Sequence, residues 1–390
     1  MLKNKIIYYI FSLLLLSACI KPFTPDIDSE AASKIVVSGK ITNKEGYQTV
    51  SLSKSILLSE LENTVLTNCM ISIWDEDGNE FTMEEHQDGE YRVWMDEEEL
   101  KIGTSYHIQI FTPEGEELVS EPDLMSAVAQ IEIPNYKEDS LYNGAYNVHD
   151  KGLQFFIDIE GNESNSSYYS FELDATYEHH ALYDREWYYD GTVNEFGRFT
   201  GRVYHIYPPD SSLYFCWTTE RVPEILLLST ENLIENKFHN FDLHFVSFRA
   251  DYLTFGYSLL ARQIGLSREA YLYWEDMKKN NNQNADLYGK QPVDIKGNIK
   301  NITNPEKEVL GFFHASAISE LRIFIEPWPT QPYPECAPVD IRRLGFRGID
   351  INDYPAFLLN NPLGDYFMFW LPDPCVNCAS LHGSTTKPNF

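Results

Sequence analysis

The sequence predicts a mainly β protein built from two β-rich domains, and three observations lead to this prediction. Hydrophobic residues make up 43% of the chain and aromatic residues 14%, far more than a disordered acidic chain carries. Short stretches in which apolar and polar residues alternate recur between turn residues from position 34 onward, as half-buried strands require. About 370 residues follow the first 18, and this length exceeds what one hydrophobic core usually serves.

The first 18 residues are expected to be a signal peptide. Lys3 and Lys5 form a basic start, and the apolar run over residues 6–16 is much shorter than the ~20 residues of a membrane-spanning helix. The run ends in Leu-Leu-Ser-Ala before Cys19, which fits the lipobox at which bacterial lipoproteins are cleaved and acylated. We therefore predict that Cys19 is lipidated and anchors the protein to a lipid bilayer. An ordinary secretory signal with an incidental cysteine is the alternative.

Residues 19–33 are expected to be a lipidated tether. They contain two prolines, three acidic residues and no apolar periodicity, a composition typical of a linker between an anchor and a folded domain.

The chain is strongly acidic, with a net charge of −29. Removal of residues 1–18 takes away two lysines and no acidic residue, so the net charge after cleavage is −31. Such a field repels phosphate backbones and anionic headgroups. The charge therefore argues against nucleic acid as a partner.

Residues 34–128 predict an immunoglobulin-like or transthyretin-like β-sandwich. Strands are expected at 35–41, 49–57 and 69–74, and the turn Asp-Glu-Asp-Gly-Asn over residues 75–79 leads into a fourth. Further strands are expected at 90–94, 105–111 and 117–120, and this spacing of 8–12 residues between turns is typical of a sandwich.

Residues 129–340 predict a larger, β-rich second domain with one or two helices. Strands are expected at 153–159, 168–173, 293–302 and 309–314. A helix is expected over 267–279, because Ser267 suits its N-cap and apolar residues follow at helical spacing. Residues 341–390 are rich in proline and bear cysteines, so we expect a disulfide-bridged C-terminal segment packed on the second domain.

The cysteines point to two disulfides. Export places them in an oxidising compartment, and we expect Cys216, Cys336, Cys375 and Cys378 to be bridged, although their spacing leaves the pairing open. Cys69 lies in an alternating stretch and is expected to be free and buried. Zinc bound by the late cysteines, and a redox-active pair at Cys375 and Cys378, are the alternatives.

No motif in the sequence indicates catalysis. Gly-x-Ser-x-Gly, His-Glu-x-x-His and a glycine-rich phosphate loop are all missing from the sequence. Residues 75–79 resemble the start of a calcium loop, but position twelve is His86 rather than the glutamate that such a loop requires. We therefore predict a protein that is not an enzyme and that needs no cofactor and no metal.

Aromatic residues are dense between positions 168 and 217, where acidic and basic residues are interleaved with them. Trp187 and Tyr189 are our candidate binding residues, because an Asp-Gly pair at 190–191 turns the chain just after them and binding residues concentrate at such turns. On a strand their rings share one face, and Tyr188 lies on the other. The alternative is that these rings form sheet core.

The chain resembles the outer-membrane lipoprotein family known as domain of unknown function 4249, which occurs in Bacteroidota-type bacteria. The matching stretches are Cys19 with its lipobox and residues 35–41, 139–142, 257–260, 269–274, 295–299, 310–316 and 375–378. The resemblance implies a lipoprotein found beside TonB-dependent outer-membrane transporters. It also implies display at the cell surface, through the acidic Asp26, Asp28 and Glu30 that follow the anchor.

We therefore expect an outer-membrane surface lipoprotein that binds a TonB-dependent transporter, its ligand, or both, without catalysis. A structural or adhesion lipoprotein of the cell envelope is the first alternative. A hydrolase of an extracellular polymer is the second.

Overall fold

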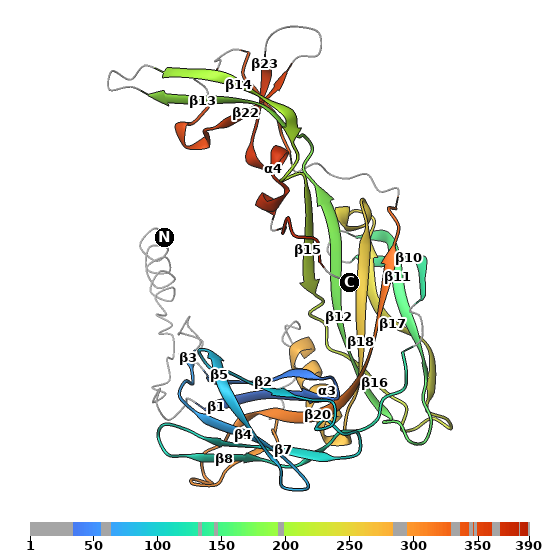
Figure 1. The fold of residues 1–390 in the computed structure, drawn as a ribbon. Helices are drawn as coiled ribbons and strands as arrows, with labels where there is room; N and C mark the ends of the chain where they lie inside the picture. The colour runs from blue at the N-terminus through green and yellow to red at the C-terminus, as the bar shows by residue number, and fades with distance from the viewer. Residues whose placement is uncertain are drawn as a thin grey trace, which may run out of the picture.

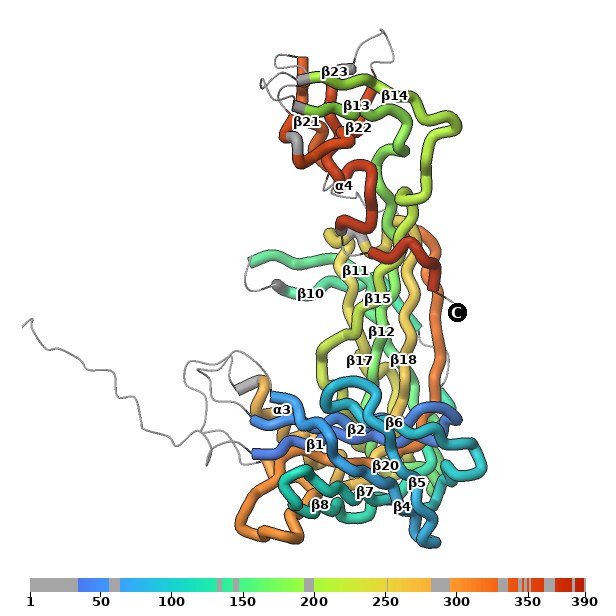
Figure 2. Tube along the Cα trace, turned by 60° about the vertical axis from the view of Figure 1, so that its left-hand side comes forward, coloured from blue at the N-terminus to red at the C-terminus, as the bar shows by residue number. Residues whose placement is uncertain are grey.

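The structure is a computed structural model that describes residues 34–55, 64–131, 135–143, 147–193, 199–283, 295–328, 336–342, 346, 349–360, 367–381 and 383–388. Strands dominate these residues, as predicted, and form sheets of fifteen, five and three strands. The molecule is curved (Figure 1), with an N-terminal unit at one end, a long sheet in the middle and a smaller distal sheet at the other end. Figure 2 shows the same order along the long axis.

The N-terminal unit is a β-sandwich, as the sequence predicted. Its early strands are β1 (Ile35–Thr42), β2 (Gly46–Lys54), β3 (Thr64–Val65), β4 (Met70–Asp75), β5 (Glu80–Gln87), β6 (Glu90–Met95), β7 (Ser105–Phe111), β8 (Glu117–Ser120) and β9 (Asp123–Leu124). The predicted turn joins β4 to β5, and the Asp75 carboxylate accepts the Asn79 N–H at 2.8 Å. Gly78 has φ +83 in this turn, a backbone conformation that suits glycine.

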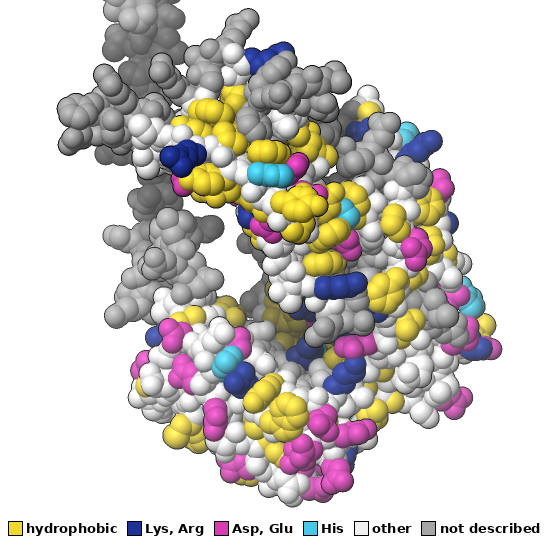
Figure 3. Space-filling model, turned by 45° about the horizontal axis from the view of Figure 1, so that its top comes forward, with side chains coloured by type: hydrophobic (Ala, Val, Ile, Leu, Met, Phe, Trp, Pro, Cys, Tyr) yellow, Lys and Arg dark blue, Asp and Glu magenta, His cyan; other side chains and the backbone are white. Residues whose placement is uncertain are grey.

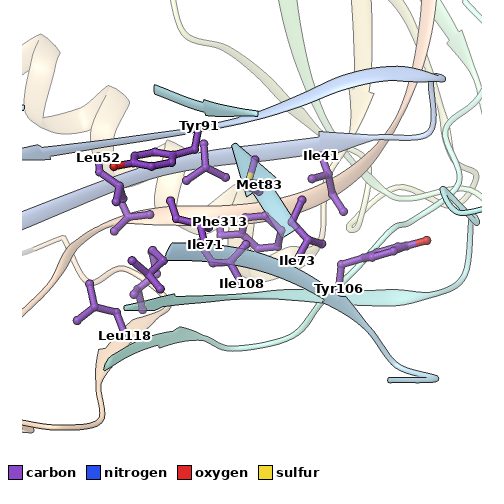
Figure 4. Packing of buried hydrophobic residues seen from close by; sticks show 14 of the residues in the cluster. Ile41, Leu52, Ile71, Ile73, Met83, Tyr91, Tyr106, Ile108, Leu118 and Phe313 are labelled. Atoms are coloured by element: carbon purple, nitrogen blue, oxygen red, sulfur yellow. The ribbon is translucent and has the colours of Figure 1, made fainter. Parts of the chain in front are cut away.

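The core of the N-terminal unit holds a residue from late in the chain. Ile41, Ile71, Tyr91 and Ile108 are fully buried, and Phe313 lies fully buried among them. Figure 4 shows the Phe313 ring between side chains of the early strands. The sandwich that we predicted for residues 34–128 is therefore completed by residues from the later part of the chain.

Strand β20 (Leu310–Ile325) belongs to both the N-terminal unit and the long sheet. Its first half pairs parallel with β1, from Val36 opposite Leu310 to Thr42 opposite Ser316. Its second half pairs antiparallel with β18 (Tyr257–Gly265). The short strand β19 (Ile299–Asn301) pairs with β8.

The long sheet contains β12 (Tyr168–His180), β15 (Phe215–Arg221), β16 (Leu226–Ser229), β18 and the second half of β20. One face packs against a three-stranded sheet of β10 (Asn135–Asn143), β11 (Val148–Glu160) and β17 (Lys237–Ser247), with a short 3-10 turn, η1 (Asp251–Leu253), nearby. The opposite face is the concave face, because the N-terminal unit and the distal sheet both project on that side (Figure 1).

Helix α3 (Arg268–Gln283) includes residues 268–279 of the helix predicted over 267–279 and extends beyond them. The Ser267 hydroxyl accepts the Ala270 N–H at 3.1 Å, which is the N-cap that the sequence suggested. The helix packs against the start of β20, where the rings of Tyr273 and Phe312 lie 4.9 Å apart. It therefore covers the junction between the N-terminal unit and the long sheet.

The distal sheet joins a hairpin from the middle of the chain to the C-terminal segment. Its order is β14 (Phe199–Asp210), β13 (Arg185–Val193), β22 (Ala356–Asn360), β23 (Phe367–Leu371) and β21 (Val339–Asp340). Short helical turns accompany it: η3 (Ile351–Asp353), α4 (Asp373–Val376) and η4 (Cys378–Leu381). The C-terminal segment therefore builds a sheet with β13 and β14, two strands that lie within the predicted second domain. The apolar face of the β13–β14 hairpin explains this arrangement, because that face must be shielded from water and the C-terminal segment shields it.

The late cysteines form two disulfides, as predicted. Cys216 on β15 is bonded to Cys378, and Cys336 is bonded to Cys375. Cys69 is free and buried, also as predicted, and burial raises the pKa of its thiol. The disulfides tie the C-terminal segment to the upper end of the long sheet and to itself.

Candidate functional site

Tyr189, one of the two predicted binding residues, belongs to the core of the distal sheet. It is 6% exposed, and its ring stacks on Phe346 with the ring centroids 4.2 Å apart. The Tyr354 ring packs edge-on against it, with the centroids 5.5 Å apart. The expectation that Tyr189 faces a partner is therefore wrong, because residues far along the chain fold over it.

Trp187 is half-buried on the same face as Tyr189, while Tyr188 packs on the other face, as strand alternation predicted. The Trp187 ring stacks on His205 of β14 at 4.0 Å, and Tyr207 follows on the same strand, 85% exposed. We call Trp187, His205 and Tyr207 the hairpin strip. His205 and Tyr207 lie on β14, the edge strand of the distal sheet among the described residues, and Trp187 lies on the neighbouring strand β13. Exposed rings beside polar groups are typical of binding surfaces.

A pocket lies on the concave face of the long sheet. It has a volume of about 220 Å³ and is lined by Thr176, Tyr177, Glu178, Trp217, Phe255, Gly256, Tyr257, Ser258, Phe324, Ile325, Glu326, Pro327 and Lys387. The side chains come from four separate strands or loops of the long sheet and from one residue near the end of the chain. Phe324 is 57% exposed and Phe255 is 36% exposed, so two phenyl rings stand at its rim.

The polar groups of the pocket are mostly engaged within the protein. Glu178 accepts the Trp217 indole N–H at 3.2 Å and lies 2.7 Å from the His180 ring nitrogen. The Ser258 hydroxyl accepts a hydrogen bond from Arg322 at 2.9 Å. These bonds hold Glu178 and Ser258 in place.

Residues 383–388, which we call the strap, cross the edge of β15 beside the pocket. Ser384 and Trp217 exchange two backbone hydrogen bonds of 2.9 Å each, which makes an isolated antiparallel bridge. Gly383 passes so close to β15 that a Cβ there would lie 2.7 Å from the Cys216 Cβ and 2.2 Å from a His179 ring nitrogen. Lys387 then lines the pocket.

Below the pocket, charged side chains alternate across the concave face. Arg262 on β18 binds Asp174 of β12 at 2.6 Å and Glu320 of β20 at 3.1 Å. Lys40 of the N-terminal unit binds Glu172 of β12 at 2.7 Å. Figure 3 shows Lys and Arg side chains in the hollow between the two ends of the molecule. This charge ladder joins the N-terminal unit to the long sheet across four strands.

Among the residues that the structure describes, no helix is long and apolar enough to cross a membrane. In the same part of the chain, no three His, Cys, Asp or Glu side chains gather as metal ligands. Cys19 and the predicted tether, residues 19–33, lie outside the described residues.

Sequence reasoning missed the pocket and the strap. Trp217 was noted only as the end of the aromatic segment, and the other lining residues come from stretches that carry no local motif. One signal was available: the disulfide expected between late cysteines and Cys216 brings the end of the chain to β15.

The comparison with protein families identifies the chain. A family model described as "Domain of unknown function (DUF4249)" matches residues 20–322, so the chain belongs to this family. No curated protein is similar enough to match. Among solved structures, the crystal structure of collagen adhesin from S. aureus shares 9% identity, with 75% of this chain and 95% of that chain covered and a TM-score of 0.08. A TM-score this low carries no argument about fold or function.

Proposed function

We propose that this protein is a lipid-anchored accessory protein of the outer-membrane surface that binds a TonB-dependent transporter, the ligand of that transporter, or both, and catalyses no reaction. The observation that carries the proposal is the hairpin strip, in which the His205 and Tyr207 rings are exposed on β14, an edge strand of the distal sheet. Rings of this kind supply large contact area at low entropic cost.

The position of the strip supports this proposal. The lipobox at Cys19 precedes β1, and β1 belongs to the N-terminal unit. The distal sheet lies at the opposite end of the molecule (Figure 1). With an anchor at one end and a contact surface at the other, a membrane-attached protein can bind a partner at a distance from the membrane surface.

The way in which the N-terminal unit is joined also supports the proposal. Strand β20 and the charge ladder hold this unit against the long sheet, so the two parts keep a fixed geometry. A binding protein benefits from such preorganisation, because less freedom is lost when the partner docks.

The first experiment tests the anchor. Cys19→Ala is expected to move the protein out of the membrane fraction and to abolish labelling with a palmitate analogue. A variant that stays membrane-bound and labelled contradicts the lipid anchor.

The second experiment tests the hairpin strip. Tyr207→Ala with His205→Ala is expected to leave the melting temperature within a few degrees but to lose most co-purification with an outer-membrane transporter. Tyr142→Ala is the matched control, because Tyr142 is 61% exposed on β10, away from the strip. Equal co-purification by the strip variant and the control contradicts the proposal. Recovery of matrix or envelope proteins in place of a transporter favours the adhesion alternative.

A further inference from the structure

The strap occupies a place on the long sheet that an external peptide can also fill. It adds to the edge of β15 as an extended segment, and only the isolated bridge between Ser384 and Trp217 bonds its backbone to that edge among the described residues. Two backbone hydrogen bonds add little net stability, because hydrogen bonds to water replace them when they break. Residues 384–387 are all exposed, so little apolar burial holds the strap down. This contact is weak enough to be exchanged for a similar one.

The chemistry of the pocket beside the strap suits a cation. Trp217, Phe255 and Phe324 supply aromatic rings, and Glu178 and Glu326 supply carboxylates. Aromatic faces and carboxylates together favour an ammonium or guanidinium group, which is attracted to both. The carboxylates repel an acidic ligand, so the pocket excludes an anionic group.

The strap itself presents a cation to this pocket. Lys387 is the one lysine or arginine among the residues of the strap, and it lines the pocket. The Cys216–Cys378 disulfide holds the preceding chain beside Trp217, which brings Lys387 within reach of the pocket. The close passage of Gly383 over Cys216 and His179 further fixes the path of the strap.

We propose that this pocket is a binding site for the lysine or arginine side chain of an extended peptide segment, and that the strap with Lys387 is an internal placeholder for that segment. The incoming peptide replaces the strap at the edge of β15 by strand addition, and its cationic side chain takes the position of Lys387. This site is separate from the hairpin strip, so the test of this proposal does not depend on the outcome for the proposed function.

The test uses the full chain and two capped peptides. One has the strap sequence Gly-Ser-Thr-Thr-Lys-Pro, and the other carries norleucine in place of lysine. Lys387→Ala is expected to bind the lysine peptide at least tenfold more tightly than the unchanged chain, because the competing cation is gone. It is expected to bind the norleucine peptide at least tenfold more weakly than the lysine peptide. Higher salt is expected to weaken the lysine peptide alone.

Two further variants locate the effect. Adding Glu326→Gln to Lys387→Ala is expected to reverse most of the gain, because one carboxylate of the pocket is removed. Lys279→Ala is the matched control, because Lys279 is an exposed lysine on α3, and it is expected to bind as the unchanged chain does. The melting temperature of each variant is measured first, and because Glu326 and Lys387 are exposed we expect shifts of only a few degrees.

Three results overturn the proposal. The first is equal binding of the lysine and norleucine peptides, since it removes the role of the cation. The second is no gain on Lys387→Ala, since it removes the role of the strap. The third is tight binding of a neutral oligosaccharide or of inorganic phosphate by Lys387→Ala without binding of the lysine peptide, since it assigns the pocket to another ligand.

Discussion

The two ends of the molecule are joined to the long sheet in different ways. The N-terminal unit is joined by a continuous strand, β20, together with ion pairs such as Lys40 with Glu172 and the contacts of helix α3. The distal sheet is joined by the chain connections around β13 and β14 and by disulfides, of which Cys216–Cys378 reaches the long sheet itself. The joint of the N-terminal unit depends on strand pairing and on packing in a core, whereas the joint of the distal sheet depends on disulfide bonds.

The difference shows that two independent means hold the ends of this molecule in fixed positions on the long sheet. A strand shared by two cores links their folding, so disturbing either core weakens both. A disulfide restricts the unfolded chain and needs no shared core. Reducing conditions are therefore expected to affect the distal sheet and the strap, while pH and packing changes act at the N-terminal joint.

The largest expected effect breaks the distal joint. Cys216→Ala with Cys378→Ala opens a loop of 162 residues, for which the chain-entropy relation gives about 5 kcal/mol of lost stability. Hydrogen exchange is expected to show early opening of the distal sheet and the strap, with the N-terminal unit still protected. Cys69→Ala is the control, because Cys69 forms no disulfide. A parallel loss of protection in the N-terminal unit contradicts the independence of the two joints.

The next effect breaks the N-terminal joint. Gly311 lies opposite Val37 in the parallel pairing of β20 with β1 and has φ +98, and a Cβ there would lie 1.8 Å from the Val37 carbonyl oxygen. Gly311→Ala is expected to cost about 3 kcal/mol or more in urea unfolding, from backbone strain and this overlap. Gly115→Ala is the matched control: it shares a positive φ of +83 but has no heavy atom within 4 Å, so about 1 kcal/mol is expected. Equal losses contradict the close approach.

The pH dependence sharpens the comparison at the same joint. Asp123 is 5% exposed and accepts the Ala315 N–H of β20 at 2.9 Å. Burial raises the pKa of Asp123 to about 6, although hydrogen bonds from Ser267 and Ala315 act against this. The folded state then binds the proton more tightly than the unfolded state, whose pKa is 3.8, so stability falls as pH rises from about 4 to about 6. The full change is about 3 kcal/mol.

The measurement compares the unchanged chain with Asp123→Asn between pH 4 and pH 7. The variant is expected to lose this decline, so its stability relative to the unchanged chain rises with pH. Burial also lowers the pKa of His314 to about 3, and this group acts in the opposite direction by removing stability as pH falls below 6.5. Both chains keep that second effect. Parallel pH profiles for the two chains contradict the raised pKa of Asp123.

The smallest effect concerns a single ion pair. Lys40 and Glu172 lie 2.7 Å apart with side-chain exposures of 30% and 26%, and a double-mutant cycle with Lys40→Met and Glu172→Gln is expected to give a coupling of about 1 kcal/mol. Lys300 and Glu121 are also 2.7 Å apart but are 68% and 57% exposed, so their coupling is expected to be close to zero. A larger coupling in the exposed pair contradicts the role assigned to partial burial.

Local features of the fold were predictable from the sequence. The turn at residues 75–79 and the N-cap of α3 at Ser267 are decided by neighbours within a few positions, and the alternating stretch around Cys69 indicated its burial. Long-range features were not. The sequence gives no sign that β20 continues past residue 314 and changes its partner from β1 to β18, because both partners lie far away in the chain.

The candidate sites show the same limit. Trp187 and Tyr188 lie on opposite faces as strand alternation predicted, but Tyr189 is covered by Phe346 and Tyr354, which no local pattern reveals. The pocket at Trp217 is assembled from distant segments of the chain. Alternation tells which face a side chain is on, and only tertiary packing tells whether that face is covered.

Because Phe313 and β20 complete the N-terminal unit, this unit can finish folding only after most of the chain has been synthesised. Lys34 and Glu308, which form an ion pair beside the first residues of β1, are 274 residues apart in sequence. A ribosome or an export channel releases β1 long before it releases the strand that completes its core. Until then, the N-terminal unit exposes the edge of β1 and the space that Phe313 fills. An incomplete sandwich of this kind attracts other strand edges, so we expect its early life to depend on a holding chaperone.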